Sequence, residues 1–306
     1  MRRVALTGAG GLVGTALRAT RPADLDLRGQ TGADAPEAGL RIADVTDAAA
    51  MAELLEGAEV LLHVAGPPSV AASFVDPAGC AAAHVVGTAT LLRAAVAAGV
   101  RRVVYLSSAE VYGRGGQSVR ETQNLAPRSP YGAAKLGAEA LCQAAHRAAQ
   151  LEVVILRPFS VYGDRLRRNS VLGDIFSQLA AGQSRIALRD PGPVRDHVHA
   201  EDLARAIWTA AQGPDAGDEA ELFNIGSGQG VSVGTLAEIA GAALGRRVEV
   251  VASAAPDRPG AADIAELVAD ITAARRHLGW TPEIALEQGL RRAFDRFCKG
   301  CDGGAR

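Results

Sequence analysis

The sequence predicts an α/β protein built on a doubly wound parallel sheet, with a smaller α/β region interleaved in its second half. Two observations favour this class. Short apolar runs alternate with longer helical patterns from the N-terminus to about residue 157, as in parallel sheets that carry helices on both faces. Glycine-rich or polar motifs follow several of these runs, at the carboxyl ends of the predicted strands, where such sheets bind their ligands.

A glycine motif follows the first predicted strand, the apolar run 4–6. It reads T-G-A-G-G-L-V-G at 7–14, and a helical pattern continues to about Thr20. In such a motif the first glycine permits the tight turn, the second lets the backbone approach a pyrophosphate, and the third allows close helix packing. The helix N-terminus supplies free N–H groups and a favourable dipole. The motif predicts a dinucleotide site at Gly8, Gly11, Leu12, Val13 and Gly14.

The second strand is predicted at Asp24–Arg28, and its end bears on the choice of cofactor. In NAD-binding proteins an acidic residue at this position binds the hydroxyls of the adenosine ribose, whereas an arginine accommodates the 2′-phosphate of NADP. The position is occupied here by Arg28, which favours NADP. If the register is shifted by two residues, Asp26 takes the role that NAD requires, so the sequence leaves both cofactors open.

Two more strands, Leu40–Ala43 and Glu59–His63, are predicted to follow. Asp44 is expected to contact the adenine amino group, whereas Asp47 is expected to cap a helix at 48–56. The fourth strand leads into the sequence H-V-A-G. Further cofactor-binding residues are predicted after these two strands, at Val45, Val64, Ala65 and Gly66.

The fifth strand, Arg102–Leu106, leads into the residues expected to carry the chemistry. Pro130 predicts a helix that begins near Tyr131, and on this helix Lys135 lies four residues further on the same face. The lysine ammonium is expected to lower the phenol pKa from its usual ~10, which makes the tyrosine an acid or base near neutral pH. Ser108 is expected to hydrogen-bond the same substrate oxygen.

Alternating elements continue in the second half of the chain. Strands are predicted at 152–157, 185–189, 221–225 and 247–251, and helices at 171–181, 200–211, 232–244, 271–278 and 283–298. Ser232 is an expected N-cap and Gly279 an expected C-cap glycine. We therefore predict a dinucleotide-binding domain at 1–165, to which later segments return, a substrate-binding region at 166–300, and a tail at 301–306.

The composition argues against several classes of protein. The net charge of −2 gives no basic footprint for nucleic acid. No apolar run is expected to approach the ~20 residues that a membrane span needs, and residues 1–6 begin a strand rather than a signal peptide. The four cysteines are scattered and do not complete a zinc site. We therefore predict a cytoplasmic protein with no metal, nucleic-acid partner or membrane association.

In their order along the chain, the motifs resemble those of the extended short-chain dehydrogenases/reductases. The closest resemblance is to the NAD-dependent nucleotide-sugar epimerase/dehydratase group, of the UDP-glucose 4-epimerase type. The motifs that carry it lie at 7–14, 44–45, 63–66, 108–113 (S-x-x-V-Y-G), 131–135 (Y-x-x-x-K), 156–163, 194–204 (V-R-D-H-V-H-A-E-D-L-A), 223–228, 258–260 and 278–282. The resemblance covers essentially the whole chain and implies a Rossmann-like fold.

The resemblance also implies roles for individual residues. Tyr131 is implied as the catalytic acid/base, Lys135 as the group that holds the nicotinamide ribose, and Ser108 as the residue that binds the sugar 4-hydroxyl. Arg195 and Arg258 are implied to bind the pyrophosphate of the nucleotide sugar, since a guanidinium matches phosphate oxygens. Further contacts are implied for the cofactor at Pro158 and for the substrate at Ser69, His84, Ser160, Ser170, Val171, Ile186 and Leu188.

The leading interpretation is a 4-epimerase that transiently oxidises C4 of a nucleotide sugar with bound NAD. Glu110 keeps a dehydratase or decarboxylase open, because relatives of those types place a glutamate there as a base. Arg28 keeps an NADPH-dependent 4-ketoreductase open, and a non-catalytic dinucleotide sensor is the alternative from another class. His84 stands where an asparagine is usual. The resemblance further implies a homodimer through the helices 77–98 and 131–149.

Overall fold

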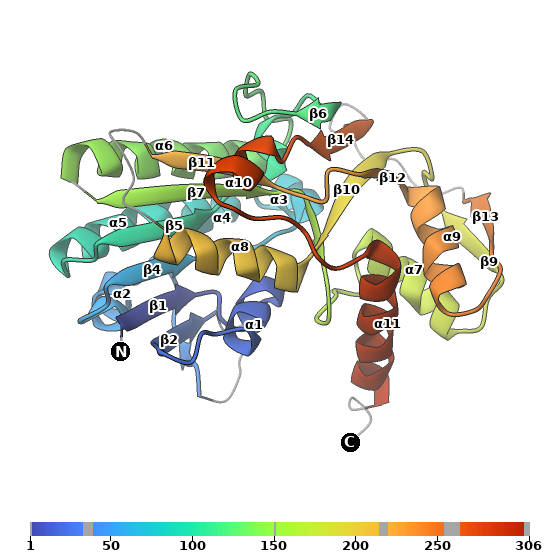
Figure 1. Ribbon diagram of the computed structural model, residues 1–306, viewed down its shortest axis with the longest axis horizontal. Coiled ribbons are helices and arrows are strands. Elements are labelled where there is room, and N and C mark those ends of the chain that lie inside the picture. Colours follow the sequence, from blue (N-terminus) through green and yellow to red (C-terminus); the bar gives the residue numbers. More distant parts are fainter. Residues whose placement is uncertain (1, 33–38, 150, 214–219, 254–263, 303–306) are drawn as a thin grey trace.

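The computed structural model describes residues 2–32, 39–149, 151–213, 220–253 and 264–302 of the 306-residue chain. Its larger part is built on a seven-stranded sheet in the order β11-β7-β5-β4-β1-β2-β3, in which every printed pairing is parallel (Figure 1). The strands are β1 (Arg2–Thr7), β2 (Leu25–Thr31), β3 (Arg41–Ile42), β4 (Val60–His63), β5 (Arg102–Leu106), β7 (Glu152–Pro158) and β11 (Glu221–Ile225).

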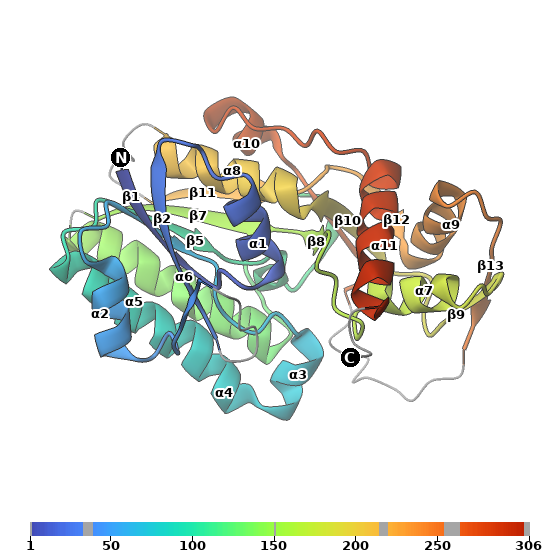
Figure 2. The same cartoon turned by 90° about the horizontal axis from the view of Figure 1, so that it is seen from below.

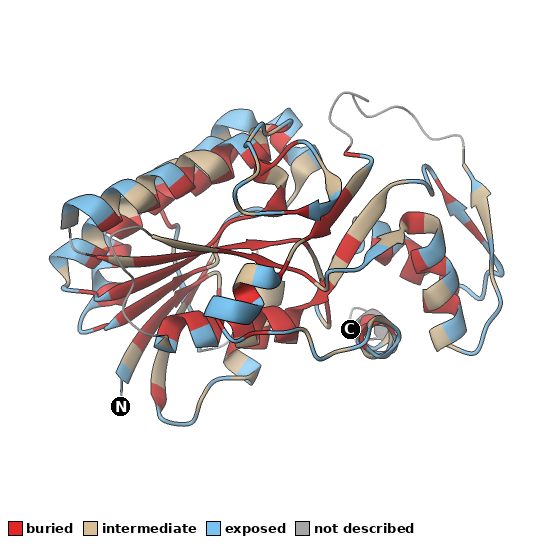
Figure 3. Ribbon diagram, turned by 45° about the horizontal axis from the view of Figure 1, so that its top comes forward, coloured by how far each residue is buried: buried red, intermediate tan, exposed pale blue. Residues whose placement is uncertain are grey.

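Helices cover both faces of this sheet, as predicted for a doubly wound fold (Figure 2). One face carries α1 (Leu12–Ala19), α8 (Ala200–Gln212) and α10 (Thr272–His277), and the other carries α2 (Ala48–Leu55), α5 (Gly87–Ala97) and α6 (Pro130–Ala149). Successive residues of a strand point to opposite faces. In β1, Val4 and Leu6 therefore join the first core and Ala5 the second, which leaves the strand buried on both sides (Figure 3).

The strand order reverses between β1 and β4, and this topological switch point positions the site. Thr7 at the end of β1 pairs with His63 at the end of β4 and with Gln30 in β2. Ligands of open α/β sheets bind in the crevice outside the carboxyl ends at such a point. The glycine motif 7–14 and the H-V-A-G segment 63–66 both follow these strand ends.

The second half of the chain forms most of a smaller region, whose strands belong to two further sheets (Figure 1). One has the order β12-β10-β14-β6, with β8 paired to β10, and the other pairs β13 with β9. The elements are β6 (Gly116–Val119), β8 (Ser160–Tyr162), β9 (Arg185–Leu188), β10 (Val194–His199), β12 (Gly230–Ser232), β13 (Glu249–Ala252), β14 (Glu266–Ala269), α7 (Val171–Ala180), α9 (Val233–Ala243) and α11 (Leu286–Asp302). The parts interleave, because β6 joins the second sheet and both β11 and α8 return to the first.

Several predicted boundaries need correction. The second strand continues to Thr31 rather than ending at Arg28, since its pairing follows β1 to Thr7. Helix α11 runs to Asp302, into the stretch predicted as a tail at 301–306. The sequence also did not predict β6, β8, β10, β12 or β14, which are three to six residues long. Such short strands lack the apolar periodicity that reveals a strand.

One continuous helical run among the described residues, Pro77–Ala97, is long and apolar enough to span a membrane, with a mean hydropathy of 1.4. The expectation that no apolar run approaches this length is therefore wrong. The run joins α4 (Pro77–Ala81), a π-helical turn at Ala82–Val86, and α5. It packs against α2 and α6, and 44% of its most apolar window is buried.

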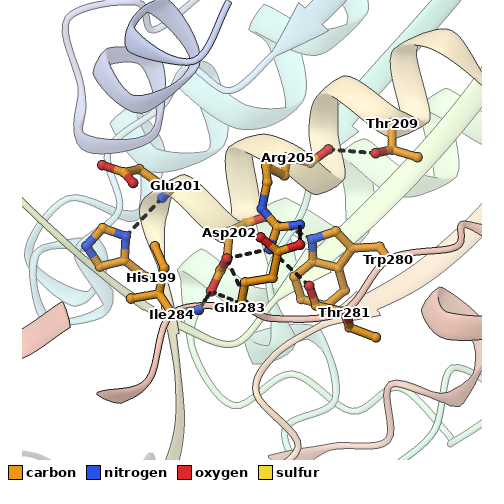
Figure 4. Close-up of polar contacts among 9 residues, drawn as sticks. All are labelled: His199, Glu201, Asp202, Arg205, Thr209, Trp280, Thr281, Glu283 and Ile284. Carbon is orange, nitrogen blue, oxygen red and sulfur yellow. Dashed lines mark hydrogen bonds and ion pairs between the residues drawn. The ribbon is translucent and has the colours of Figure 1, made fainter. Parts of the chain in front are cut away.

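Asp202 in α8 ties two of the sequence motifs together (Figure 4). Its buried carboxylate accepts hydrogen bonds from the backbone N–H groups of Glu283 at 3.2 Å and Ile284 at 3.0 Å, and from Arg205 at 2.6 Å. Its carbonyl accepts the indole N–H of Trp280 at 2.9 Å. The V-R-D-H-V-H-A-E-D-L-A motif thereby holds the L-G-W-T-P segment against the sheet.

Replacing Asp202 by alanine is expected to cost about 2–4 kcal/mol, because two part-buried backbone donors and Arg205 lose their acceptor together. Asp202→Asn keeps one acceptor oxygen and is expected to lose less. Denaturant unfolding of both variants checks the order. Equal midpoints for Asp202→Ala and the unmodified protein would show that this network contributes nothing to stability.

Candidate active site

The glycine turn has the geometry that a dinucleotide pyrophosphate needs. Gly8 has φ +72°, and a Cβ there would lie 2.8 Å from the Ala65 backbone. A Cβ on Gly14 would lie 2.1 Å from the Gly8 carbonyl oxygen. Gly11 is exposed and is the N-cap of α1, which has no side-chain cap. The outer glycines are therefore required by protein contacts, whereas the middle one leaves uncapped N–H groups open to an anion.

The end of β2 differs from both sequence interpretations. Arg28 is exposed and lies three residues before the end of the strand, opposite Ala5. Asp26 lies further back and forms an ion pair with Arg3 at 3.2 Å. The last two residues of the strand are instead Gln30 and Thr31. The side-chain amide of Gln30 donates to the Ala43 carbonyl. The observation that favoured NADP is thus removed, because the arginine is not at the strand end.

The other predicted cofactor residues lie at neighbouring strand ends. Asp44 is exposed, and its carboxylate accepts bonds from the backbone and hydroxyl of Thr46 at 2.8 and 2.6 Å, which lower the pKa of the carboxyl group. Val45 is buried against Gly87. After β4, Val64 is half-buried, Ala65 is buried and Gly66 is exposed. Asp47 caps α2 through two backbone N–H groups, as predicted.

Two serines fix the start of α6 and with it the predicted catalytic tyrosine. Ser129 accepts the backbone N–H of Gly132 at 3.0 Å, as an N-cap does, and Pro130 is the first helical residue. Ser73, from α3 (Val70–Val75), accepts the backbone N–H of Tyr131 at 3.1 Å. The serine–proline pair signals the cap in the sequence, whereas the Ser73 contact has no local signal.

The ionisation of Tyr131 and Lys135 differs from the expectation. Burial raises the pKa of Tyr131 to about 12, against a hydrogen bond from Ser108 that lowers it. Lys135 is not among the causes of this shift: its Nζ donates to the Leu106 carbonyl at 2.7 Å, and burial lowers its own pKa to about 8. The prediction that this lysine pulls the phenol pKa below its usual value is therefore wrong for the protein without cofactor, because desolvation dominates.

The four predicted catalytic residues nevertheless come together. Ser108 caps a 3-10 turn at Ala109–Val111 by accepting the backbone N–H of Glu110 at 3.2 Å. The Glu110 carboxylate is half-buried and close enough to Tyr131 to raise the pKa of the phenol. A hydroxyl, a carboxylate, a phenol and an ammonium thus share the carboxyl edge of β5, where proton transfer to and from a bound substrate oxygen is chemically feasible.

A buried ion pair that the sequence did not reveal lies one helical turn beyond Lys135. The Glu139 carboxylate accepts two hydrogen bonds from Arg157, of 2.9 and 2.7 Å, and a third from the Ser107 hydroxyl. Arg157 also donates to the Tyr112 hydroxyl at 3.0 Å. Glu139 raises the pKa of Lys135 against the effect of burial. This pair therefore joins α6 to β7 and helps Lys135 to keep its proton.

His84 lies at the end of a buried hydrogen-bond chain that begins at Thr7, and its ring contacts Tyr131. The Thr7 hydroxyl lies 2.8 Å from Nδ1 of His63, whose Nε2 lies 3.0 Å from the Thr88 hydroxyl. Thr88 donates to the His84 carbonyl, so Nε2 of His63 must carry the proton. The His84 ring bonds the Pro67 carbonyl at 3.1 Å and meets the Tyr131 ring edge-on, with centroids 5.3 Å apart. Its side chain is thus held within the protein.

This chain predicts a pH-dependent stability. Burial lowers the pKa values of His63 and His84 to about 3, below the ordinary 6.5, so the unfolded chain binds more protons between these values. The free energy of unfolding is therefore highest above about pH 6.5 and falls as the pH falls toward 3, by up to ~1.4 kcal/mol per pH unit for each histidine. Thermal unfolding from pH 7.5 to 5 should be less pH-dependent for His84→Asn. An unchanged slope would contradict the contribution of His84.

The predicted substrate residues lie in two settings. Ser69 and Ser170 are N-caps of α3 and α7. Ser160 on β8 pairs with His197 on β10. Arg195, two residues before His197 on β10, is half-buried. Val171 is exposed at the start of α7, Pro158 ends β7, and Ile186 and Leu188 are buried in the core beneath α7 and α9. Arg258 lies outside the described residues.

The switch-point glycine turn and the Ser108, Tyr131 and Lys135 set lie at the carboxyl edge of one parallel sheet, as expected for an enzyme that uses a nicotinamide dinucleotide. Residues 4–226 match the family described as NAD dependent epimerase/dehydratase family. The chain belongs to this family, which is of the extended short-chain dehydrogenase/reductase type and uses NAD. The residues of the glycine turn fit that cofactor.

Individual relatives and structures agree with this assignment. The chain is 34% identical to a UDP-glucose 4-epimerase of Mycolicibacterium smegmatis, over 83% of this chain and 81% of the relative. It is 32% identical to a dTDP-L-rhamnose 4-epimerase of Burkholderia thailandensis, over 94% and 93%. The structure of a dTDP-glucose 4,6-dehydratase, DesIV of Streptomyces venezuelae with NAD bound, superimposes with a TM-score of 0.85 at 29% identity, covering 99% of this chain and 98% of that one.

Proposed function

We propose that this chain is a nucleotide-sugar 4-epimerase that oxidises the sugar at C4 and reduces it again with the same bound NAD. The observation that carries the proposal is the convergence of Ser108, Tyr131 and Lys135 at the carboxyl edge of the sheet, beside the glycine turn. The similarity to 4-epimerases of both UDP- and dTDP-sugars supports this reaction.

Each of these three residues has a separate role in the proposed reaction at C4. Bound NAD would supply the acceptor and donor of the C4 hydride, and its cationic ring would favour the phenolate of Tyr131. Tyr131 removes the proton of the 4-hydroxyl and later returns it. Ser108, which hydrogen-bonds the phenol in the free protein, holds the same sugar oxygen. Lys135, with a pKa of about 8, remains largely protonated at neutral pH and favours negative charge at this edge.

A dehydratase or decarboxylase is the second candidate, and Glu110 favours it. Its carboxylate lies close enough to Tyr131 to raise the phenol pKa, so a base for the proton next to C4 would be available at this edge of the sheet. The likeness to a dTDP-glucose 4,6-dehydratase supports this alternative. The NADPH-dependent 4-ketoreductase was suggested by Arg28 at the end of β2. Arg28 does not lie at that end, so this alternative is less well supported. A non-catalytic sensor has no use for the three converging groups.

Product analysis tests the proposal. The protein is incubated with NAD and a panel of UDP-, dTDP- and GDP-sugars, and the products are separated by chromatography and weighed. An epimer of unchanged mass is expected, and Glu110→Gln should keep most of the activity. Products lighter by water or carbon dioxide, lost in Glu110→Gln, would instead establish the second candidate.

We also expect a cytoplasmic homodimer. The helices 77–98 and 131–149 lie side by side on one face of the sheet, and Val86 and Val96 on the first of them are 53% and 47% exposed. A dimer through these helices would bury both valines against the second copy. Light scattering should give the mass of two chains, and the mass of one chain would reject the dimer.

A further inference from the structure

The Lys135 ammonium is buried at the carboxyl end of β5. Lys135 is 4% exposed, and its Nζ donates to the Leu106 carbonyl at 2.7 Å. Glu139 lies one helical turn further along α6, but its carboxylate already accepts hydrogen bonds from Arg157 and Ser107. Among the residues that the structure describes, no carboxylate forms an ion pair with Lys135. Because burial disfavours the charged form of an amine, another group must compensate this charge.

The face of the Tyr105 ring supplies such a group. Nζ of Lys135 lies over this ring, 5.0 Å from its centroid, which is within the ~6 Å range of a cation–π contact. The face of an aromatic ring carries negative potential, and its attraction for a cation is strongest where water is excluded. Tyr105 is 1% exposed, so both partners are withdrawn from water. The ring of Tyr105 and the carbonyl of Leu106 thus hold the ammonium from two successive residues of β5.

The position of the Tyr105 ring is itself determined by the sheet. Tyr105 belongs to the core that β5 forms with α5 and α6, and it pairs with Ile155 of β7. Its ring also contacts the His63 ring, with centroids 5.4 Å apart. His63 is held by hydrogen bonds at both ring nitrogens. The ring therefore has a defined place between the switch point of the sheet and the lysine.

Other titratable groups face the ammonium from the elements around it. They are Glu139 and Cys142 on α6, Cys80 on α4, His84 in the π-helical turn and His63 on β4. Burial lowers the pKa values of both histidines to about 3 and raises the pKa values of both thiols, so these four groups are neutral near pH 7. The favourable contributions to the charge of Lys135 thus come from Glu139 and from the ring face.

We propose that Tyr105 is a positioning residue that holds the Lys135 ammonium at the active-site edge through the face of its ring and stabilises its positive charge. Tyr105 acts through Lys135 and not on the sugar. This inference rests on the proposed role of Lys135 in catalysis. The lysine can be observed without any sugar, so failure of this inference is distinguishable from failure of the proposed reaction.

The lysine content of the chain makes the observation direct. Lys135 and the exposed Lys299 are its only lysines, so protein labelled with ¹³C at lysine Cε gives two NMR signals. The variant Lys299→Arg assigns them. Titration from about pH 6 to 11 then follows each lysine separately, with Lys299 as the internal reference.

Tyr105→Leu is expected to lower the pKa of Lys135 by about one pH unit, because the cation–π contact is lost. Tyr105→Phe keeps the ring face and should leave this pKa unchanged. Ile155→Ala removes buried apolar volume beside Tyr105 but no ring, and it should not lower the pKa. An unchanged or raised pKa in Tyr105→Leu would overturn the proposal, because the ring would then only fill space and water in its place would favour the charged form.

A side chain of similar shape gives the same test if Tyr105→Leu does not fold. Pentafluorophenylalanine in place of Tyr105 keeps the ring but withdraws electrons from its face, so the pKa of Lys135 should fall below its value in Tyr105→Phe. Equal pKa values in these two proteins would overturn the proposal.

Discussion

Tyr131→Phe is expected to reduce kcat by about 10²–10⁴-fold, the usual contribution of a positioned acid or base. The change removes one hydroxyl and leaves the ring in its contact with His84, so the helix start and the glycine turn should keep their structure. NAD binding should therefore stay within about twofold of the unmodified protein. Turnover and NAD titration on the same preparation measure both effects.

Tyr162→Phe is the matched control, since it removes a hydroxyl from another buried tyrosine, in the core of the smaller region. Its turnover should remain within a few-fold of the unmodified enzyme. If Tyr131→Phe turned over at the same rate as Tyr162→Phe, the phenol would not carry the proton, and the assignment of the active site would fail.

Arg157→Met is expected to destabilise the protein by about 3–5 kcal/mol, because it leaves the Glu139 carboxylate buried without its partner. Arg157 is 2% exposed and Glu139 1% exposed, so water cannot replace the lost contact. Urea unfolding monitored by circular dichroism measures the loss. The change also removes the hydrogen bond from Arg157 to the Tyr112 hydroxyl. This hydroxyl itself donates to the buried side chain of Asn224.

The double variant Glu139→Gln, Arg157→Met removes the uncompensated charge and should recover part of the stability lost in Arg157→Met. Such a recovery identifies the buried charge, rather than lost packing, as the main cost. A double variant no more stable than the single one would contradict this explanation. Because Glu139 also supports the charge of Lys135, the double variant should still lose activity.

The sequence predicted best those elements whose signal is local. β5 and β11 have the predicted bounds. In β5 the signal is a continuous apolar run, Val103–Leu106, after two arginines. The capping roles of Asp47 and Ser232 were also correct, since an N-cap depends on the next three residues alone. The common helix of Tyr131 and Lys135 was predictable because Pro130 marks its start and the two residues are four apart.

Features that depend on pairing between distant segments were not predictable. The end of β2 is decided by its register with β1, so neither Asp26 nor Arg28 could be placed from the local pattern. The Glu139–Arg157 pair also joins elements that no sequence period connects. The pKa of Tyr131 was misjudged for a related reason: burial is a property of the assembled fold, and it outweighs the neighbouring lysine.

The most direct test of the proposed function follows the hydrogen at C4. A nucleotide hexose carrying deuterium at C4 is converted by the NAD-loaded enzyme, and the product is analysed by mass spectrometry and NMR. Transient oxidation with return of the same hydride predicts a C4 epimer that keeps the deuterium at C4, with no net consumption of NAD. A product that has lost the deuterium from C4, or has lost water, would contradict the 4-epimerase.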